Sequence, residues 1–341
     1  MSDNGAMSDS LSSSRASWLA QAGWGVMFHY IDQPASSTVI SATSAEAWAR
    51  RVDRFDVERF CRDIRSLGAG YVIFTVGQNT GHYCAPNPVY DELTGLTPSL
   101  LSSRDLIAEI AAGLAPEVKL IAYLPSGAPV HHESSVRALR CTPPWDASAW
   151  GLTRTWPDEE SADERLSAFQ QNWEAVIRCW GQQWGRLVAG WWIDGCYFSD
   201  RMYEHADAPN FASLAQALRT GNPDRILAFN AGTDHASVRL TVEQDYAAGE
   251  VSTQLPVGNK WDPFVGEIHG MQNHVLSYLG DWWGSGEPRF SAAFVQQYTS
   301  YLMERNVAVT WDVPILNDGR IPEAFLEQLG PLAKARSPLI S

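Results

Sequence analysis

The 341-residue chain is 45% hydrophobic and 19% charged and contains 26 Gly and 19 Pro, a composition typical of globular proteins that excludes disordered and collagen-like chains. Its 25 Lys and Arg residues against 39 Asp and Glu residues give a formal net charge of -14, so we expect no nucleic-acid and no membrane partner and favour a neutral or weakly cationic ligand. The five cysteines are scattered and form no Cys-x-x-Cys pair, which argues against a disulfide framework or a zinc ribbon.

The chain begins with a polar, serine-rich stretch. We predict a disordered tail over residues 1–16 and a single domain over residues 17–341, because no linker or repeat divides the remainder. The first residues lack the basic and apolar regions of a secretory signal, and no apolar run reaches the roughly 18 residues that cross a bilayer. The sequence therefore predicts a cytoplasmic protein.

Apolar runs of strand type alternate along the chain with segments whose apolar residues have helical spacing. Predicted strands lie at residues 25–30, 71–75, 120–124, 187–194, 226–230 and 307–311, with a short one near 245–246. Predicted helices lie at residues 55–64, 105–114, 162–180, 211–219 and 292–303. This alternation predicts a parallel sheet covered by helices, because each crossover packs a helix back onto the sheet.

Repeated strand and helix units at this length favour a barrel over an open sheet. We predict an α/β fold, namely a (β/α)8 TIM-like barrel with room for an irregular closure. The chemistry of such a barrel lies at the carboxyl ends of its strands. The candidates are therefore the polar residues that end or follow a predicted strand: His29, Asp32, Gln78, Asn79, Ser126, Asp194, Asn230, Glu250 and Asp312.

The histidines and acids form no recognisable metal motif. Nitrogen and oxygen ligands are available from His29, His131, His132, Asp194 and His235, but no His-x-His follows the first strand and the spacing is not tight. We therefore predict no metal and no cofactor, and keep a metal-dependent barrel hydrolase as an alternative.

The most informative segment is Trp191-Trp192-Ile193-Asp194-Gly195, in which an acid closes an apolar strand beside two indoles. A carboxylate in a dry, aromatic pocket suits glycoside cleavage, where one carboxylate faces the anomeric carbon and a second group protonates the leaving oxygen. Tryptophan faces stack on sugar rings and leave the indole N–H to donate. The alternative is structural, with Asp194 capping the next element and the tryptophans filling the core.

These residues resemble a known family. The segments 25–30, 55–75 and 192–195, in this order, resemble the α-L-fucosidases of glycoside hydrolase family 29. The segments 245–250, 266–268, 282–284 and 313–322 resemble the remaining blocks of that family, so the resemblance spans about residues 23–333. The order of the blocks carries the resemblance, since no single block is very specific.

The resemblance implies roles for the matching residues. Asp194 matches the nucleophilic aspartate, Trp192 a tryptophan that lines the sugar pocket, and His29 a histidine that binds a sugar hydroxyl. Glu250 matches the glutamate that serves several members as acid/base, with Glu267 as the fallback. The family's barrel is followed by a small β-sandwich, which we expect to be absent or vestigial here.

The sequence departs from the family pattern where the sugar is recognised. Gln78 and Asn79 replace a pair of histidines, and Asn230 stands near the place of an arginine. We predict a retaining exo-glycosidase, α-L-fucosidase-like, that forms a covalent glycosyl-aspartate intermediate on a carbohydrate substrate, with Trp24 bordering the pocket. A non-catalytic sugar-binding barrel is the other alternative, and assembly into a homo-oligomer is left open.

Overall fold

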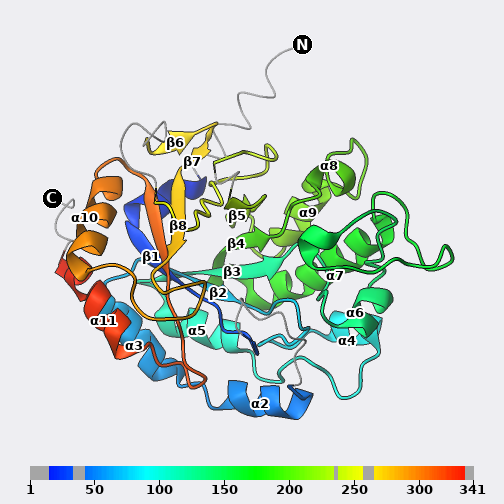
Figure 1. The fold of residues 1–341 in the computed structure, drawn as a ribbon, viewed down its shortest axis with the longest axis horizontal. Coiled ribbons are helices and arrows are strands. Elements are labelled where there is room, and N and C mark those ends of the chain that lie inside the picture. The colour runs from blue at the N-terminus through cyan, green and yellow to red at the C-terminus, as the bar shows by residue number, and fades with distance from the viewer. Residues whose placement is uncertain (1–14, 34–42, 234–236, 256–264, 335–341) are drawn as a thin grey trace.

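The computed structural model describes residues 15–33, 43–233, 237–255 and 265–334. Its centre is a seven-stranded, entirely parallel sheet in the order β5-β4-β3-β2-β1-β9-β8 (Figure 1). The strands are β1 (Trp24–Phe28), β2 (Tyr71–Thr75), β3 (Lys119–Pro125), β4 (Val188–Asp194), β5 (Ile226–Phe229), β8 (His274–Tyr278) and β9 (Ala308–Asp312). A separate antiparallel pair consists of β6 (Glu267–Ile268) and β7 (Met271–Gln272).

Helices cover the outer face of this sheet, and Figure 1 shows α3, α5, α10 and α11 on one side of the strands and α7 and α9 on another. Asp56 and Asp105 accept backbone N–H groups at the starts of α3 and α5, which satisfies donors that a helix leaves unpaired. The helices are α2 (Ala45–Asp53), α3 (Val57–Leu67), α4 (Pro88–Thr94), α5 (Leu106–Leu114), α6 (Glu133–Ala138), α7 (Ser167–Trp184), α8 (Ser199–Met202), α9 (Phe211–Leu218), α10 (Ala292–Met303) and α11 (Glu323–Leu329).

An irregular segment, residues 245–251, bridges the two edge strands of the sheet. The Asp245 backbone N–H donates to the Leu227 carbonyl of β5 at 2.9 Å. Farther along the segment, the Val251 N–H donates to the Leu276 carbonyl of β8, and the Leu276 N–H donates to the Gly249 carbonyl, both at 2.8 Å. The sheet is thus a curled half-barrel, consistent with a TIM-like barrel whose remaining gap this segment occupies.

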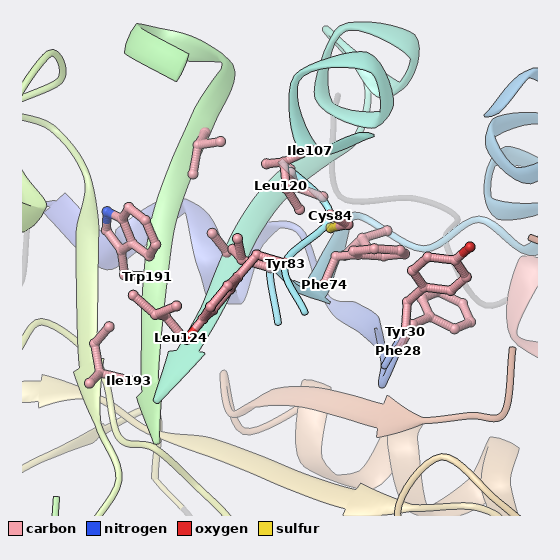
Figure 2. Close-up of a cluster of buried hydrophobic side chains, with 14 of the residues drawn as sticks. Phe28, Tyr30, Phe74, Tyr83, Cys84, Ile107, Leu120, Leu124, Trp191 and Ile193 are labelled. Carbon is pink, nitrogen blue, oxygen red and sulfur yellow. The ribbon is translucent and has the colours of Figure 1, made fainter. Parts of the chain in front are cut away.

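Two hydrophobic clusters lie on opposite faces of the curled sheet. Phe28, Phe74, Leu120 and Trp191 belong to the larger cluster, between the strands and the helices, part of which Figure 2 shows. The smaller cluster lies inside the curl and includes Met27, Tyr71, Ile73, Ile121, Tyr123, Trp192 and Leu276. Neighbouring residues of one strand fall into different clusters because successive side chains point to opposite faces.

The structure confirms the predicted parallel sheet with its helical cover, and the five predicted helices correspond to α3, α5, α7, α9 and α10, whereas α2, α4, α6, α8 and α11 were not predicted. Strand β8 was not predicted. Residues 1–14 of the predicted tail lie outside the described residues, whereas residues 15–21 are helical and Ala16 is buried. The part of the chain described after α11 is a short 3-10 helix, and no β-sandwich occurs in the described ranges. Nor does any described helix have the length and apolarity needed to cross a membrane.

Candidate active site

Two carboxylates from distant parts of the chain converge at the carboxyl ends of the strands. Asp194 ends β4, Glu250 lies on the bridging segment, and Asn230 follows β5. The Asn230 amide nitrogen Nδ2 donates to Asp194 Oδ1 at 2.8 Å and to Glu250 Oε2 at 2.5 Å. The two carboxylate oxygens are therefore at most 5.3 Å apart, the sum of these two distances.

Three donors surround the Asp194 carboxylate. The Gly195 backbone N–H and the Asn230 amide both donate to Oδ1 at 2.8 Å, and the Tyr123 hydroxyl donates to Oδ2 at 2.5 Å. Burial, followed by the charge of Asp194, raises the pKa of Tyr123 well above its usual value, so the phenol stays neutral and acts as a donor. The Gln78 amide donates in turn to the Tyr123 oxygen at 2.7 Å. This network orients Asp194 and stabilises its negative charge.

Glu250 is held in a different electrostatic environment. Burial and the nearby Asp194 charge raise the pKa of Glu250 to about 7, although the Asn230 hydrogen bond and the His29 charge oppose the shift. Gly249 places the glutamate here. Its φ is +73°, and a Cβ atom on it would lie 2.4 Å from the His274 carbonyl oxygen, so this close approach requires glycine.

His29 follows β1 and is anchored by the carboxylate that ends β9. Its Nδ1 lies 2.7 Å from Asp312 Oδ1, and the Gly284 backbone N–H donates to Asp312 Oδ2 at 2.5 Å. Burial alone lowers the pKa of His29, but Asp312, with smaller contributions from Asp194 and Glu250, outweighs it and raises that pKa above its ordinary value. The site thus combines an imidazole with two carboxyl groups, and Nε2 is the ring nitrogen that no described residue engages.

A cavity of about 230 Å³ contains these groups. The Trp192 ring lines it and stacks on Tyr123 with a centroid distance of 5.3 Å and an interplanar angle of 15°. Aromatic rings beside carboxylates can bind the apolar face of a sugar while polar groups bind its hydroxyls. The full lining is Met27, His29, Gln78, Tyr123, Trp192, Asp194, Glu250, Leu276, Trp282 and Trp283.

Two further cavities adjoin this one, which contains the candidate catalytic residues and which we therefore call the catalytic cavity. One, of about 170 Å³, shares Gln78 and Asp194 with it and reaches Trp150 and Tyr197. The other, of about 310 Å³, shares His29 and Trp283 with it. The two neighbours share no lining residue, so the catalytic cavity lies between them. The arrangement offers room for groups attached to a bound sugar.

The structure brings together most of the residues singled out from the sequence. Asp194, Glu250, His29, Trp192 and Gln78 all line the catalytic cavity. Asn230 bridges the two carboxylates, and Asn79 lines the adjoining 170 Å³ cavity.

Two predicted residues do not join the site. Trp24 begins β1 and is buried in the core at the opposite end of the strand from His29, about 16 Å away at the rise of an extended chain. Glu267 is exposed in β6, where it pairs with Gln272 of β7. The structure therefore assigns the second carboxylate of the cavity to Glu250 and not to Glu267.

The two tryptophans before Asp194 differ in their surroundings. Trp192 faces the cavity, but its indole N–H donates to the Ala248 carbonyl at 3.0 Å, so the ring face is what it offers a ligand. Trp191 points the other way, into the helix layer, and its N–H donates to the Leu218 carbonyl. The alternation of side chains along a strand is the reason that only one indole borders the site.

Sequence reasoning missed Tyr123 and Trp283 as parts of this site and named Asp312 without a role. Tyr123 was placed in a strand but not in the cavity, and the role of Asp312 as the partner of His29 was left open. Trp283 lies between the His29 ring and Tyr278. The strand-end rule could have identified Tyr123, since it lies near the carboxyl end of β3.

Among the described residues, no three His, Cys, Asp or Glu side chains are grouped as metal ligands.

No protein-family model matches the chain, and no curated protein matches it. Several solved structures do match the chain. The endo-fucoidan hydrolase MfFcnA4 of glycoside hydrolase family 107 aligns with a TM-score of 0.67 and 15% identity, over 95% of this chain and 54% of the other, so the chain spans about half the length of that protein. The endo-fucoidan hydrolase P5AFcnA of the same family aligns with a TM-score of 0.63 and 14% identity, over 96% and 95% of the two chains.

A third structure, the α-L-fucosidase AlfC from Lactobacillus casei in complex with its α-L-fucose product, aligns with a TM-score of 0.60 and 17% identity, over 94% of this chain and 97% of that one. At these identities the likeness is one of fold. The chain therefore has a fold shared with glycoside hydrolases that act on fucose-containing substrates.

Proposed function

We propose that this protein is a retaining glycoside hydrolase in which Asp194 is the nucleophile and Glu250 the acid/base. The observation that carries the proposal is the spacing of the carboxylates, whose nearest bridged oxygens are at most 5.3 Å apart. Retaining glycosidases hold their two carboxyl groups about 5 Å apart, whereas inverting enzymes need roughly 6.5–9.5 Å to admit a water molecule.

The surroundings of the two carboxyl groups differ in the way that this reaction requires. Glu250, with a pKa of about 7, keeps its proton in a large share of molecules at neutral pH. Asp194 accepts three hydrogen bonds as a carboxylate. Because Glu250 Oε2 accepts from Asn230, Oε1 is the oxygen that carries the proton to be donated.

In the first step an Asp194 oxygen attacks the anomeric carbon and forms an ester. The bond from that carbon to the leaving oxygen breaks, and the Glu250 proton moves to the leaving oxygen. In the second step a water molecule gives its proton to Glu250 and attacks the anomeric carbon, which releases the sugar and restores both side chains. The loss of the Asp194 charge in the ester lowers the pKa of Glu250 and thereby turns the acid into a base.

Other residues of the cavity bind the sugar in this proposal. The His29 imidazolium, fixed by Asp312, donates from Nε2 to a sugar hydroxyl, while the Trp192 ring packs on the apolar face. Gln78 and Asn79 help select the sugar. The fold shared with AlfC and the endo-fucoidan hydrolases supports an α-L-fucose-like sugar as the unit that is bound.

Removal of a terminal sugar is the form of the reaction that we propose first. The two cavities that flank the catalytic cavity support a second candidate, cleavage within a chain. Product analysis separates the two, because an exo-acting enzyme releases only monosaccharide from an oligosaccharide, whereas cleavage within the chain releases shorter oligosaccharides early in the reaction.

The test is hydrolysis of nitrophenyl glycosides, including the α-L-fucoside. Asp194→Gly should lower turnover by at least about 10³-fold, and azide should restore activity to Glu250→Ala and trap a glycosyl azide. Glu267→Ala is the matched control and should retain activity, because its carboxylate lies outside the cavity. A non-catalytic sugar-binding barrel would show no hydrolysis and keep its affinity in Asp194→Asn. Loss of activity with a chelator would instead favour the metal-dependent alternative.

A further inference from the structure

A fourth cavity, of about 620 Å³, lies beside α2 and contains four arginines. Arg50 and Arg51 are in the last turn of α2, and Arg54 directly follows the helix. Arg320 lies across from them, in the chain after β9. We call this space the arginine cavity, and its other lining residues are Ala47, Ile315, Leu316, Asn317 and Asp318.

The arginine cavity connects to the catalytic cavity. It shares Arg51, Ile315 and Asn317 with the 310 Å³ cavity. That cavity in turn shares His29 and Trp283 with the catalytic cavity. The three cavities therefore adjoin one another in series, from Asp194 to the arginines.

The local charge is opposite to that of the whole chain. Arg320 Nε pairs with Asp318 Oδ2 at 2.7 Å, and Arg50 lies near enough to Glu46 to lower the pKa of that glutamate, after larger contributions from hydrogen bonds to the Glu46 backbone and Ser44. The four guanidinium groups and these two carboxylates together give the region around the arginine cavity a net charge of +2, whereas the whole chain has a net charge of -14. Basic residues often stabilise a helix C-terminus, but that role requires neither Arg320 nor a cavity between the two elements.

Arg51 is fixed in place and has an unused donor. Its guanidinium carbon lies 4.9 Å from the Tyr30 ring centroid and 5.5 Å from that of Trp48. Its Nε is buried and has no hydrogen-bond partner in the described part of the chain. Buried donors in native proteins are nearly always paired, so an unpaired donor on a residue that lines two cavities is compatible with an acceptor that a ligand supplies. A stacked, planar guanidinium suits an oxyanion in particular.

We propose that the arginine cavity binds an anionic group, a sulfate ester or a carboxylate, on a carbohydrate chain whose reacting sugar lies at Asp194. The inference rests on the proposed function for the placement of that sugar. It also modifies the expectation from net charge, because a neutral or weakly cationic ligand suits the whole surface but not this part of it. The substrate class is thus an acidic glycan and not a neutral one.

The experiment measures binding by calorimetry to the Asp194→Asn variant, so that no ligand is cleaved. The probes are a sulfated fucose trisaccharide, its unsulfated parent and a trigalacturonate. We expect the sulfated probe to bind at least about tenfold more tightly than its parent, and high salt to reduce this ratio. Arg54→Gln and Arg320→Gln, made in that background, should each reduce the ratio about fivefold. Arg186→Gln is the control, because it removes an exposed, ion-paired arginine that lies outside these cavities.

If the trigalacturonate binds more tightly than the sulfated probe, the proposal is supported with a carboxylate as the anion. The proposal would be overturned if the sulfated probe and its unsulfated parent bound equally well. It would also be overturned if the preference for the sulfated probe were unchanged in the triple variant Arg50→Gln, Arg54→Gln and Arg320→Gln. Arg51→Lys keeps the charge but not the planar fork, and should also reduce the ratio. The proposed function is tested independently of the anion site. If the wild type does not hydrolyse aryl glycosides but arginine-dependent binding persists, the catalytic assignment is wrong and the anion site stands.

Discussion

The Asp194→Asn variant should lower the pKa of Glu250, and this change tests the electrostatic coupling on which the proposed reaction depends. In the wild type, burial and the Asp194 charge together raise the pKa of Glu250 to about 7. The asparagine keeps the size of the side chain but removes the negative charge. The burial contribution should remain, and the charge contribution should disappear.

The size of the shift follows from the geometry. Two unit charges at most 5.3 Å apart interact by about 3 kcal/mol at an effective dielectric constant of about 20, which corresponds to about 2 pKa units. Solvent in the open cavity weakens the interaction, so we expect the pKa of Glu250 to fall by about 1 to 2 units. His29→Gln should move it in the opposite direction, because the His29 charge lowers this pKa.

The assay is a carbon-detected NMR titration of protein labelled at the glutamate side-chain carboxyl, with Glu250→Gln used to assign the resonance. An unchanged or higher pKa in Asp194→Asn would refute the reasoning, because it would mean that the two carboxylates do not interact in solution. The same titration in Glu267→Gln should leave the Glu250 resonance unaltered, since Glu267 is exposed on β6.

Three more outcomes follow from the structure. Tyr123→Phe removes the hydroxyl that donates to Asp194 and should lower kcat/KM for an aryl glycoside about 10- to 100-fold without loss of fold by circular dichroism. Phe74→Ala empties a fully buried position that contacts other aromatic rings and should lower the free energy of unfolding in urea by about 3–5 kcal/mol. The folded chain binds the Glu250 proton more tightly than the unfolded chain, so stability should fall as pH rises from about 4.5 to about 7, and Glu250→Gln should flatten that slope in urea melts at several pH values.

Local patterns were sufficient to predict most of the fold. The strand at residues 71–75 was predicted with its observed bounds because all of its residues are apolar or β-branched and it lies between a glycine turn and polar residues. Strand β8 was not predicted, because His274 and Ser277 interrupt its apolar pattern. Both are buried and paired, His274 with Thr310 at 2.7 Å and Ser277 with the Ser252 carbonyl at 3.1 Å. Such pairings join distant parts of the chain, so periodicity does not reveal them.

For the site, position along a strand was the useful guide and residue type alone was not. His29, Gln78, Asp194 and Asn230 were predicted because they end or follow strands, whose carboxyl ends meet at one rim. Trp24 was also predicted to border the pocket, yet it begins its strand and lies in the core. The choice between Glu250 and Glu267 needed the hydrogen bonds of the bridging segment, which no local pattern encodes.

The two acids of the cavity are carried by parts of the backbone that differ in regularity. Asp194 ends a strand paired on both sides, whereas Glu250 lies on a connection with few ladder bonds and a glycine held close to β8. Because a few hydrogen bonds of an irregular segment hold Glu250 in the cavity, insertion of one residue before it should displace its carboxylate and leave Asp194 in place. Under the proposed function, this single change of length would remove hydrolysis and keep sugar binding, which is a short evolutionary route from a glycosidase to a lectin.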